Sequence, residues 1–335
     1  MGDRELDILY ISGAPRSGST ILGMILGQLE GCCDVGELWA LWRPAFKNHD
    51  LCGCGVAVDR CPFWSAVLLE ALGPEFAERG PRLGELHRQT MGTMRAPLVW
   101  AHARGWRRRP EYAEYAEGLA AHYRAIAQVS GARTIVDSSK MASDALIAGA
   151  IPGVRLSVLH LVRDPRGMAW SWQKQVRQPG PQGRQLERHG VLGSAARWDA
   201  YNAFALLLLA PRLGERFRTV RYEDLVRDPA GVAAELARWI GADPATVPVT
   251  ADPPVLALTR PTHSVWGNPT RINTGQVPLR LDDEWNQRMS PAAQRAVALA
   301  TLPFLARYGY GVRPHRAQPP QMLTIESSLP KGLDQ

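Results

Sequence analysis

The feature that constrains the fold most is a glycine-rich turn between an apolar run and a helix-like run near the N-terminus. The run Leu6–Ser12 is short, apolar and β-branched, which predicts a buried strand. Gly13-Ala-Pro-Arg-Ser-Gly-Ser-Thr20 follows, and the apolar residues of Thr20–Leu29 then recur at helical spacing. In such a unit, backbone N–H groups and the helix N-terminus hold a phosphate. Glycines alone also fit an ordinary tight turn, but the whole segment favours a phosphate-binding loop.

The cation of this loop is not where a Walker A motif has it. A Walker A lysine reaches the β- and γ-phosphates of a nucleoside triphosphate, and Ser19 stands in its place here. The cation is Arg16, three residues earlier. We therefore expect phosphate binding without triphosphate hydrolysis, with a kinase-like phosphotransferase and a catalytically silent nucleotide-binding scaffold as alternatives. The candidate binding residues are Arg16, Ser17, Gly18, Ser19 and Thr20.

Three further apolar runs predict more strands, and helical stretches separate them. They are Arg133–Asp137, Arg155–Val162 and Phe217–Tyr222. Parallel strands need crossover connections, so this alternation predicts an α/β fold of the three-layer, P-loop-like type: a central parallel sheet flanked by helices. In such sheets, ligands bind at the carboxyl ends of the strands.

We expect one domain over residues 1–313, with a helical insertion over the sheet around residues 65–130. Residues 314–335 are rich in proline and lack apolar periodicity, which predicts a loosely ordered tail. Proline and capping residues mark the remaining elements. These are a helix that Asp228-Pro229 caps and that ends at Trp239, a helix from Ser290-Pro291 to about Tyr308, and a mobile loop at Gly180–Gly183.

A second anion-binding motif follows the predicted strand Arg155–Val162. Arg163 stands at the end of that strand, and Asp164-Pro165 is typical of a helix start. Ser171 then comes about two turns into the helix, where it and Arg163 can hold one phosphate. The alternative is that Arg163 and Asp164 only cap the helix. Two phosphate-type motifs at the same edge of one sheet favour a ligand with two phosphate groups.

With both motifs present, the chain resembles the sulfotransferases that use 3′-phosphoadenosine 5′-phosphosulfate (PAPS), over roughly residues 6–310. The resemblance implies the P-loop-like α/β fold, with the 5′-phosphosulfate held by the loop from Arg16 to Thr20 and the 3′-phosphate held by Arg163 and Ser171. Val136–Lys140 and Arg221–Leu225 also resemble family segments, and the second implies that Tyr222 lies near the adenine.

The chain departs from the soluble animal enzymes of that family at two places, and the first, Arg16, resembles the carbohydrate-modifying and bacterial branches. The soluble animal enzymes have lysine in the first loop, where this chain has Arg16. Their C-terminal Arg-Lys-Gly run is not found, and His263–Arg271 stands in its place. We assign Gly267, Asn268 and Arg271 there as candidate donor-binding residues.

The resemblance implies in-line sulfuryl transfer, which requires stabilisation of charge on the oxygen of the leaving group. Arg16 is the first candidate cation and Lys140 the second, although a lysine at the end of a strand also fits a simple cap. We expect the reaction to need no metal. For the general base, which removes the acceptor proton, a Gly-Glu segment of bacterial relatives implies Glu37. His49 and His160 are the runners-up, but His160 lies inside an apolar strand, typical of a core residue.

The acceptor is left open by the sequence. Trp39, Trp42, Trp100 and Trp106 follow the first loop and can stack on a sugar or a flat ring, although core packing fits most tryptophans equally well. We expect the hydroxyl of a small molecule, glycan or glycolipid. The sequence does not decide between oxygen and nitrogen acceptors or predict an oligomeric state.

Charge and hydropathy exclude other classes of protein. The 39 Lys and Arg against 32 Asp and Glu leave a net charge of +7, which suits an anionic ligand. The basic residues are scattered and accompany no nucleic-acid-binding motif, so we expect no nucleic acid partner. The longest apolar run, Ala203–Ala210, is too short to span a membrane. The N-terminus has no signal-peptide pattern, and we expect a cytoplasmic protein without integral membrane contact.

Five cysteines lie within the first fifth of the chain. Their odd number and the lack of a secretion signal argue against a disulfide framework. Three interpretations remain: a zinc site completed by Cys33 or His49, a redox-labile pair, or packed small thiols, which we favour. The cluster in question is Cys52, Cys54 and Cys61.

Overall fold

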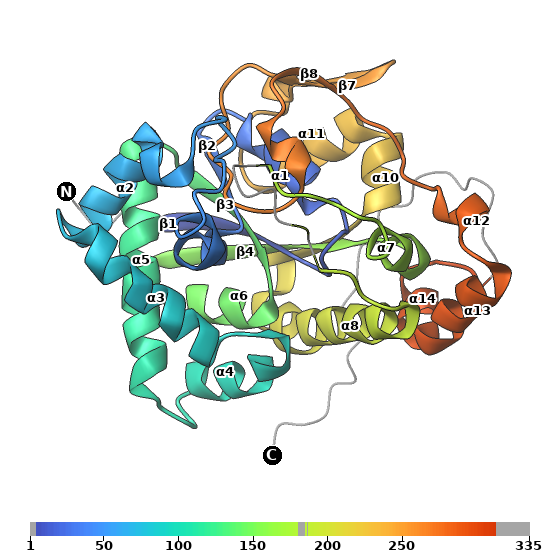
Figure 1. Ribbon diagram of the computed structural model, residues 1–335, viewed down its shortest axis with the longest axis horizontal. Coiled ribbons are helices and arrows are strands. Elements are labelled where there is room, and N and C mark those ends of the chain that lie inside the picture. The colour runs from blue at the N-terminus through green and yellow to red at the C-terminus, as the bar shows by residue number, and fades with distance from the viewer. Residues whose placement is uncertain (1–4, 180–184, 186, 313–335) are drawn as a thin grey trace.

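The computed structural model describes residues 5–179, 185 and 187–312, and its centre is a parallel sheet of five strands (Figure 1). The strand order is β2-β3-β1-β4-β5, so the N-terminal strand is the middle one. All three later strands predicted from the sequence are present, within a few residues of the expected bounds. The strands are β1 (Leu6–Ser12), β2 (Cys32–Gly36), β3 (Thr134–Lys140), β4 (Val154–Val162) and β5 (Phe217–Arg221).

Helices cover both faces of this sheet because successive residues of its strands point to opposite sides. In β1, Ile8 and Tyr10 belong to one apolar cluster, which includes residues of helices α5 (Pro110–Ser130) and α6 (Ala142–Ala148). Leu9 and Ile11 belong to a second cluster, with residues of α1 (Ser19–Gly27) and α11 (Pro229–Trp239). The predicted three-layer α/β fold is confirmed.

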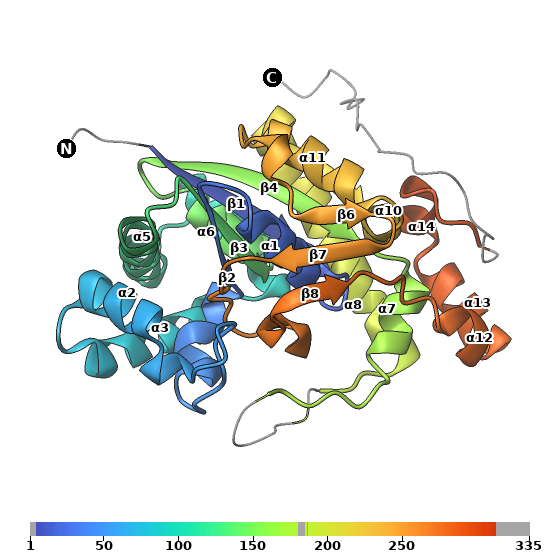
Figure 2. The ribbon, with the colours of Figure 1, turned by 90° about the horizontal axis from the view of Figure 1, so that it is seen from above.

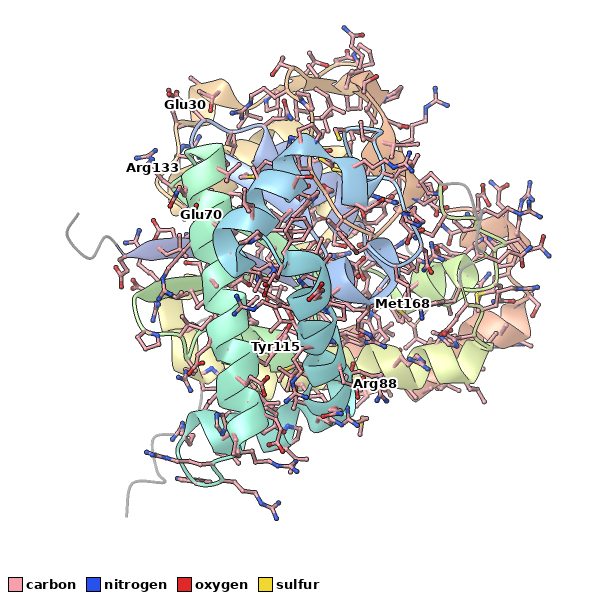
Figure 3. The ribbon with its side chains drawn as sticks, turned by 60° about the vertical axis from the view of Figure 1, so that its left-hand side comes forward. Glu30, Glu70, Arg88, Tyr115, Arg133 and Met168 are labelled. Atoms are coloured by element: carbon pink, nitrogen blue, oxygen red, sulfur yellow. The ribbon has the colours of Figure 1, made fainter. Side chains whose placement is uncertain are left out.

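The segment between β2 and β3 is mostly helical. It contains α2 (Pro62–Leu72), α3 (Phe76–Thr90), α4 (Ala96–Ala103) and α5. Figure 3 shows α3 and α5 side by side, with Tyr115 of α5 between them. The Tyr115 ring lies 5.6 Å from the His87 ring of α3. We call these four helices the helical wall; the turns that follow β2 pack against it through α3.

Four strands were not predicted: β2 and a small antiparallel sheet in the order β6-β7-β8. The small sheet lies beside α1 and α11, as Figure 2 shows. Its strands are β6 (Val249–Ala251), β7 (Pro254–Leu258) and β8 (Gly275–Pro278). They have three to five residues and several exposed positions, so they lack the continuous apolar run that identifies a buried strand.

The predicted helix from Pro229 to Trp239 is confirmed, with the Asp228 side chain as its N-cap. The helix predicted from Pro291 to Tyr308 is two helices, because Pro303 has no N–H for the helical hydrogen bond.

The other helices are α7 (Pro165–Ser171), α8 (Val191–Phe204), α9 (Ala210–Leu213), α10 (Tyr222–Arg227), α12 (Trp285–Arg288), α13 (Pro291–Ala300) and α14 (Leu302–Arg307). Short 3₁₀ or π turns are η1 (Leu38–Ala40), η2 (Leu41–Ala45), η3 (Val58–Arg60), η4 (Thr93–Arg95), η5 (Ala205–Leu209), η6 (Gly214–Arg216), η7 (Pro244–Thr246) and η8 (Pro269–Ile272).

Two predictions concern residues outside the described part of the chain, namely the mobile loop at 180–183 and the loose tail at 314–335. Among the described residues, no helix has both the length and the apolar character that crossing a bilayer requires.

Candidate active site

The loop between β1 and α1 depends on two glycines that lie against other elements. Gly13 has φ 151°, and a Cβ there would lie 2.2 Å from the Leu161 carbonyl oxygen of β4. Gly18 has φ 93°, and its Cβ would lie 2.5 Å from the Tyr222 ring. Larger residues at either position would push the loop away from the sheet. Helix α1 begins at Ser19, so its first-turn N–H groups lack helical partners at this end.

A cavity of about 1500 Å³ opens at the carboxyl ends of the strands. Each strand of the parallel sheet supplies at least one lining residue at or just after its end: Arg16 after β1, Glu37 after β2, Lys140 in β3, Arg163 after β4 and Tyr222 after β5. The other predicted site residues that line it are Gly18, Ser19, Thr20, Ser171, Gly267 and Asn268.

Backbone strain is concentrated at this cavity. Four non-glycine residues of the described chain have positive φ: Arg16 (72°), Lys140 (73°), Trp266 (63°) and His49 (55°). The first three line the cavity. Such conformations cost free energy and cluster at functional sites, where the surrounding structure enforces them. At Lys140 the carbonyl is held by the Gly13 N–H at 3.2 Å and the Ser12 hydroxyl at 3.1 Å.

Glu37 and Lys140 form a buried ion pair on one side of the cavity. Lys140 Nζ lies 2.5 Å from Glu37 Oε1, and the two side chains are only 7% and 10% exposed. The Trp39 indole N–H donates to Glu37 Oε2 at 3.1 Å, and Lys140 also donates to the Ser138 carbonyl at 3.2 Å. Each charge is therefore compensated, which burial requires.

Besides the Glu37–Lys140 pair, the cavity is lined by two neighbouring cations, Arg16 and Arg163. Burial lowers the pKa of Arg16, Glu37 opposes this shift, and the positive charge of Arg163 adds to it. The Arg16 guanidinium lies over the Trp172 ring at 5.3 Å. Arg163 Nη1 donates to the Arg16 carbonyl at 3.0 Å, so the second motif is bonded directly to the first loop. Two neighbouring cations provide a positive centre for an anion.

Arg163 is itself paired, on the side away from Glu37. Its Nη2 lies 3.1 Å from Asp282 Oδ2 and donates to the Asp282 carbonyl at 2.6 Å. Its guanidinium lies 4.6 Å from the centre of the Tyr222 ring. Burial opposes ionisation of Asp282, but Arg163 and Lys174 hold the pKa of Asp282 below its ordinary value. Arg163 does not cap α7, because the N-cap residue of that helix is Asp164.

Two predicted residues do not line the cavity. Ser17 is buried within the loop, and Arg271 is fully buried behind the segment that carries Gly267. Arg271 Nη1 donates to Gln178 Oε1 at 2.9 Å, while Gln178 Nε2 donates to the Gly267 carbonyl at 2.9 Å. Arg271 thus supports the segment rather than facing the cavity.

The segment after β7 is fastened to the first loop and to β2. The Asn268 N–H donates to Thr20 Oγ1 at 3.1 Å, and the Glu37 N–H donates to the Val265 carbonyl at 2.8 Å. The Ser264 hydroxyl donates to the buried Asp34 carboxyl. Burial raises the pKa of Asp34 to about 6, although the Ser264 and Gly36 hydrogen bonds oppose the shift.

The two histidines considered as alternative bases lie outside the cavity. His160 is fully buried, with Nε2 2.9 Å from Asn202 Oδ1 and 3.1 Å from the Tyr308 hydroxyl, and burial lowers its pKa to about 4. It is a core residue, as the apolar strand around it predicts. His49 is exposed and paired with Asp59 at 2.8 Å.

A buried histidine that the sequence did not identify does line the cavity. His87 Nε2 lies 2.8 Å from Asp144 Oδ1, and the His87 ring stacks on Trp39 at 5.5 Å. No local motif links the two residues, because they come from α3 and α6. Of the four tryptophans considered for the acceptor side, Trp39 and Trp42 line the cavity and Trp100 and Trp106 do not.

The cysteines form no disulfide in the described part of the chain. Cys52, Cys54 and Cys61 lie together with His263. The candidates proposed from the sequence to complete this group were wrong: His49 pairs with Asp59, and Cys33 lies on β2 beside Ser130. The true neighbour is about two hundred residues away along the chain, beyond the reach of spacing rules.

Comparisons with known proteins identify the family of this chain. Residues 9–245 match the family model described as "Sulfotransferase family". A segment of 102 residues is 35% identical to mouse carbohydrate sulfotransferase 5 and covers 27% of this chain and 26% of that protein. The chain thus spans about a quarter of the length of this curated relative.

Solved structures of similar fold are also sulfotransferases. The sulfotransferase domain from the curacin biosynthetic pathway has 18% identity and a TM-score of 0.51, over 92% of this chain and 99% of that one. The domain from the Synechococcus PCC 7002 olefin synthase has 21% identity and a TM-score of 0.48, over 92% and 96%. Nothing in these comparisons favours the kinase alternative. Because the family model covers most of the chain, from β1 through α11, the protein belongs to the sulfotransferase family.

Proposed function

We propose that the protein transfers the sulfuryl group of PAPS to a hydroxyl of a small-molecule, glycan or glycolipid acceptor. The observation that carries this proposal is that two phosphate-type motifs open into one cavity and are bonded to each other. The first is the loop with Arg16, and the second is Arg163 with Ser171. A ligand with phosphate groups at two positions can contact both motifs, whereas a ligand with a single phosphate can contact only one of them.

The residues of the cavity fit this donor by charge and by shape. The loop from Arg16 to Thr20, at the start of α1, would hold the 5′-phosphosulfate, and Arg163 with Ser171 would hold the 3′-phosphate. The Tyr222 ring, which packs between Gly18 and Arg163, would lie near the adenine. Gly267 and Asn268 would close the site over Thr20, and Arg271 would act as their support.

When bound, PAPS supplies an activated sulfuryl group with a phosphate leaving group. Arg16 would stabilise the negative charge that grows on the leaving oxygen, since it lies in the loop that would hold the phosphosulfate. Lys140, at the end of β3, would neutralise the sulfuryl oxygens. Glu37 accepts the proton of the acceptor hydroxyl and is the general base. None of these roles requires a metal ion.

The ion pairs described above have a consequence for this assignment. Lys140 is 2.5 Å from Glu37, so the carboxylate takes a proton only as Lys140 shifts its interaction toward the sulfuryl group. Arg163 likewise exchanges part of its interaction with Asp282 for the 3′-phosphate. Paired side chains hold the buried charges in place until an anionic ligand competes for them.

The acceptor occupies the side of the cavity that the helical wall forms. Trp39, Trp42 and Trp266 supply apolar ring faces there, Arg43 supplies positive charge, and Arg88 is paired with Glu85. Aromatic faces beside polar groups suit a sugar or a flat ring that carries hydroxyl groups. The cavity volume of about 1500 Å³ exceeds that of a usual single-ligand pocket, about 300–1000 Å³, and leaves space for donor and acceptor together.

Calorimetry tests the donor assignment without knowledge of the acceptor. We expect 3′-phosphoadenosine 5′-phosphate (PAP) to bind more tightly than AMP, which lacks the 3′-phosphate, and more tightly than ATP. Transfer of ³⁵S from labelled PAPS to a panel of phenols, sugars and glycolipids then identifies the acceptor class. Equal affinity for PAP and AMP, or a clear preference for ATP, would overturn the proposal.

A further inference from the structure

Four side chains that the proposed reaction does not use converge at one point. Cys52 and Cys54 lie in the loop before η3, Cys61 is the N-cap of α2, and His263 follows β7. Their ligand atoms all lie within 4.8 Å of one another. Cys52 and Cys61 are fully buried, and Cys54 and His263 are partly buried.

The distances within this group fit a single tetrahedral metal ion. The Cys61 sulfur lies 3.6 Å from that of Cys54 and 3.7 Å from that of Cys52, and His263 Nδ1 lies 3.6 Å from the sulfurs of Cys52 and Cys61. Zinc–sulfur bonds of about 2.3 Å at the tetrahedral angle place two sulfurs roughly 3.8 Å apart. A group with three sulfurs and one imidazole nitrogen is a standard zinc ligand set.

Neighbouring groups hold the His263 ligand in place. The Trp64 indole N–H donates to the His263 carbonyl at 3.0 Å, and the Phe63 ring stacks on the His263 ring at 4.2 Å. Contacts of this kind orient a metal ligand.

The two other interpretations of the cysteines explain less of this geometry. A disulfide requires two sulfurs about 2.05 Å apart, and it would leave the third cysteine and His263 without a role. Packed apolar thiols do not require an imidazole nitrogen equidistant from two sulfurs. Only a shared ion gives all four groups one partner.

We propose that Cys52, Cys54, Cys61 and His263 Nδ1 bind one zinc ion as a closed structural site. Four protein ligands leave no open position, so the ion has no part in the chemistry of sulfuryl transfer. Binding displaces the thiol protons to solvent and involves no change of oxidation state.

This site would join the helical wall to the segment that closes the donor cavity. The Gly53 N–H donates to the Ser264 carbonyl at 3.0 Å, so backbone contacts already pair the two segments beside the ligands. The next residues after Ser264 are Val265, which bonds to Glu37, and Trp266 and Gly267, which line the cavity. Zinc would therefore fix the distance between the wall and this segment.

Metal analysis of the full chain tests the proposal. After purification without chelators and without a metal-affinity step, native mass spectrometry and elemental analysis should give one zinc ion per chain. Replacement by Co²⁺ should give the intense visible bands of tetrahedral cobalt together with thiolate charge-transfer absorption. Only traces of metal, iron in place of zinc, or a disulfide among these cysteines would each overturn the proposal.

Matched variants locate the ion. Cys61→Ser and His263→Ala should lose most of the zinc, and Cys33→Ser, a cysteine outside the group, should retain it. If Cys61→Ser fails to fold, mercurial titration of the wild-type protein serves instead, because zinc should be released as three thiols react. Full zinc retention in both ligand variants, or zinc release that does not follow thiol modification, would overturn the assignment.

Discussion

The cavity has an ion pair at each end, and the two pairs differ in how many partners the carboxylate has. Glu37 is almost fully buried, and among the described residues its ion-pair partner is Lys140, with the Trp39 indole as a further hydrogen-bond donor. Asp282 is a third exposed and is shared by Arg163 and Lys174, whose Nζ lies 3.2 Å from Asp282 Oδ1. Loss of Lys140 would therefore leave the Glu37 carboxylate buried without its ion-pair partner. Loss of Arg163 would leave Asp282 paired with Lys174. This difference predicts chemistry at the Glu37 end and ligand binding at the Asp282 end.

The largest effect is expected for Glu37→Gln. The amide keeps the shape but cannot accept a proton, so turnover should fall about 10²- to 10⁴-fold with PAP affinity changed only a few-fold. Steady-state kinetics measure the turnover, and calorimetry with PAP measures the affinity.

Glu75→Gln, an exposed glutamate elsewhere, is the matched control. Near-normal turnover in Glu37→Gln would remove the assignment of the base. His87, paired with Asp144 and facing the same cavity, would then replace His49 as the next residue to test.

Lys140→Met should lower turnover by about 10²- to 10³-fold, the usual cost of one missing charge-stabilising group. It should also lower the melting temperature, because Glu37 is then buried without its cation. The double variant Lys140→Met/Glu37→Gln should recover part of the melting temperature but none of the activity. A double variant less stable than the single one would contradict the view that the pair compensates buried charges.

Arg163→Ala should weaken PAP binding roughly ten- to hundredfold, as for a lost charged hydrogen bond. AMP binding should change much less, since AMP has no 3′-phosphate for Arg163 to contact. Arg163→Lys should recover only part of the affinity, because lysine lacks the planar fork. Calorimetry with PAP and AMP measures these affinities, and Arg212→Ala, at an exposed position, is the control. Equal losses of affinity for PAP and AMP would show that Arg163 does not bind the 3′-phosphate.

Asp282→Asn should tighten PAP binding by about two- to fivefold, the range of a partly exposed charge interaction. The negative charge next to Arg163 competes with the phosphate, and the amide keeps the side-chain shape. Arg163 and Lys174 hold the pKa of Asp282 below its ordinary value, so the carboxylate stays ionised from neutral pH down to mildly acidic pH. The ratio of PAP affinities between variant and wild type should therefore stay constant from neutral to mildly acidic pH. Equal affinities at the acid end of this range would contradict the prediction. Asp283→Asn, next in the chain and exposed, is the control.

The smallest effect is expected for magnesium. Activity should not depend on added magnesium, because Ser19 stands where a Walker lysine would be and the cation of the loop is Arg16. Transfer assays with and without magnesium test this directly. A strict requirement would support a phosphotransferase mechanism.

The parts of the fold that local sequence determines were predictable. A buried parallel strand is a continuous apolar run, so β1, β3, β4 and β5 were recognised. The glycine-rich loop with Arg16 placed the candidate site at the carboxyl ends of these strands. Contacts between distant segments were not predictable. Asp282 and His263 reach their partners only through the tertiary fold, and short exposed strands such as β6 lack an apolar run.

The order of the strands also affects how the chain reaches this structure during synthesis. Of the five strands of the parallel sheet, the first to be synthesised is the central one, and Leu9 pairs with Val136 on one side and Ser157 on the other. At roughly 5 to 20 residues per second, β1 waits on the order of ten seconds for its neighbours. Its apolar residues stay unpaired during that interval, so slow translation or early truncation should favour aggregation or chaperone binding of the nascent chain.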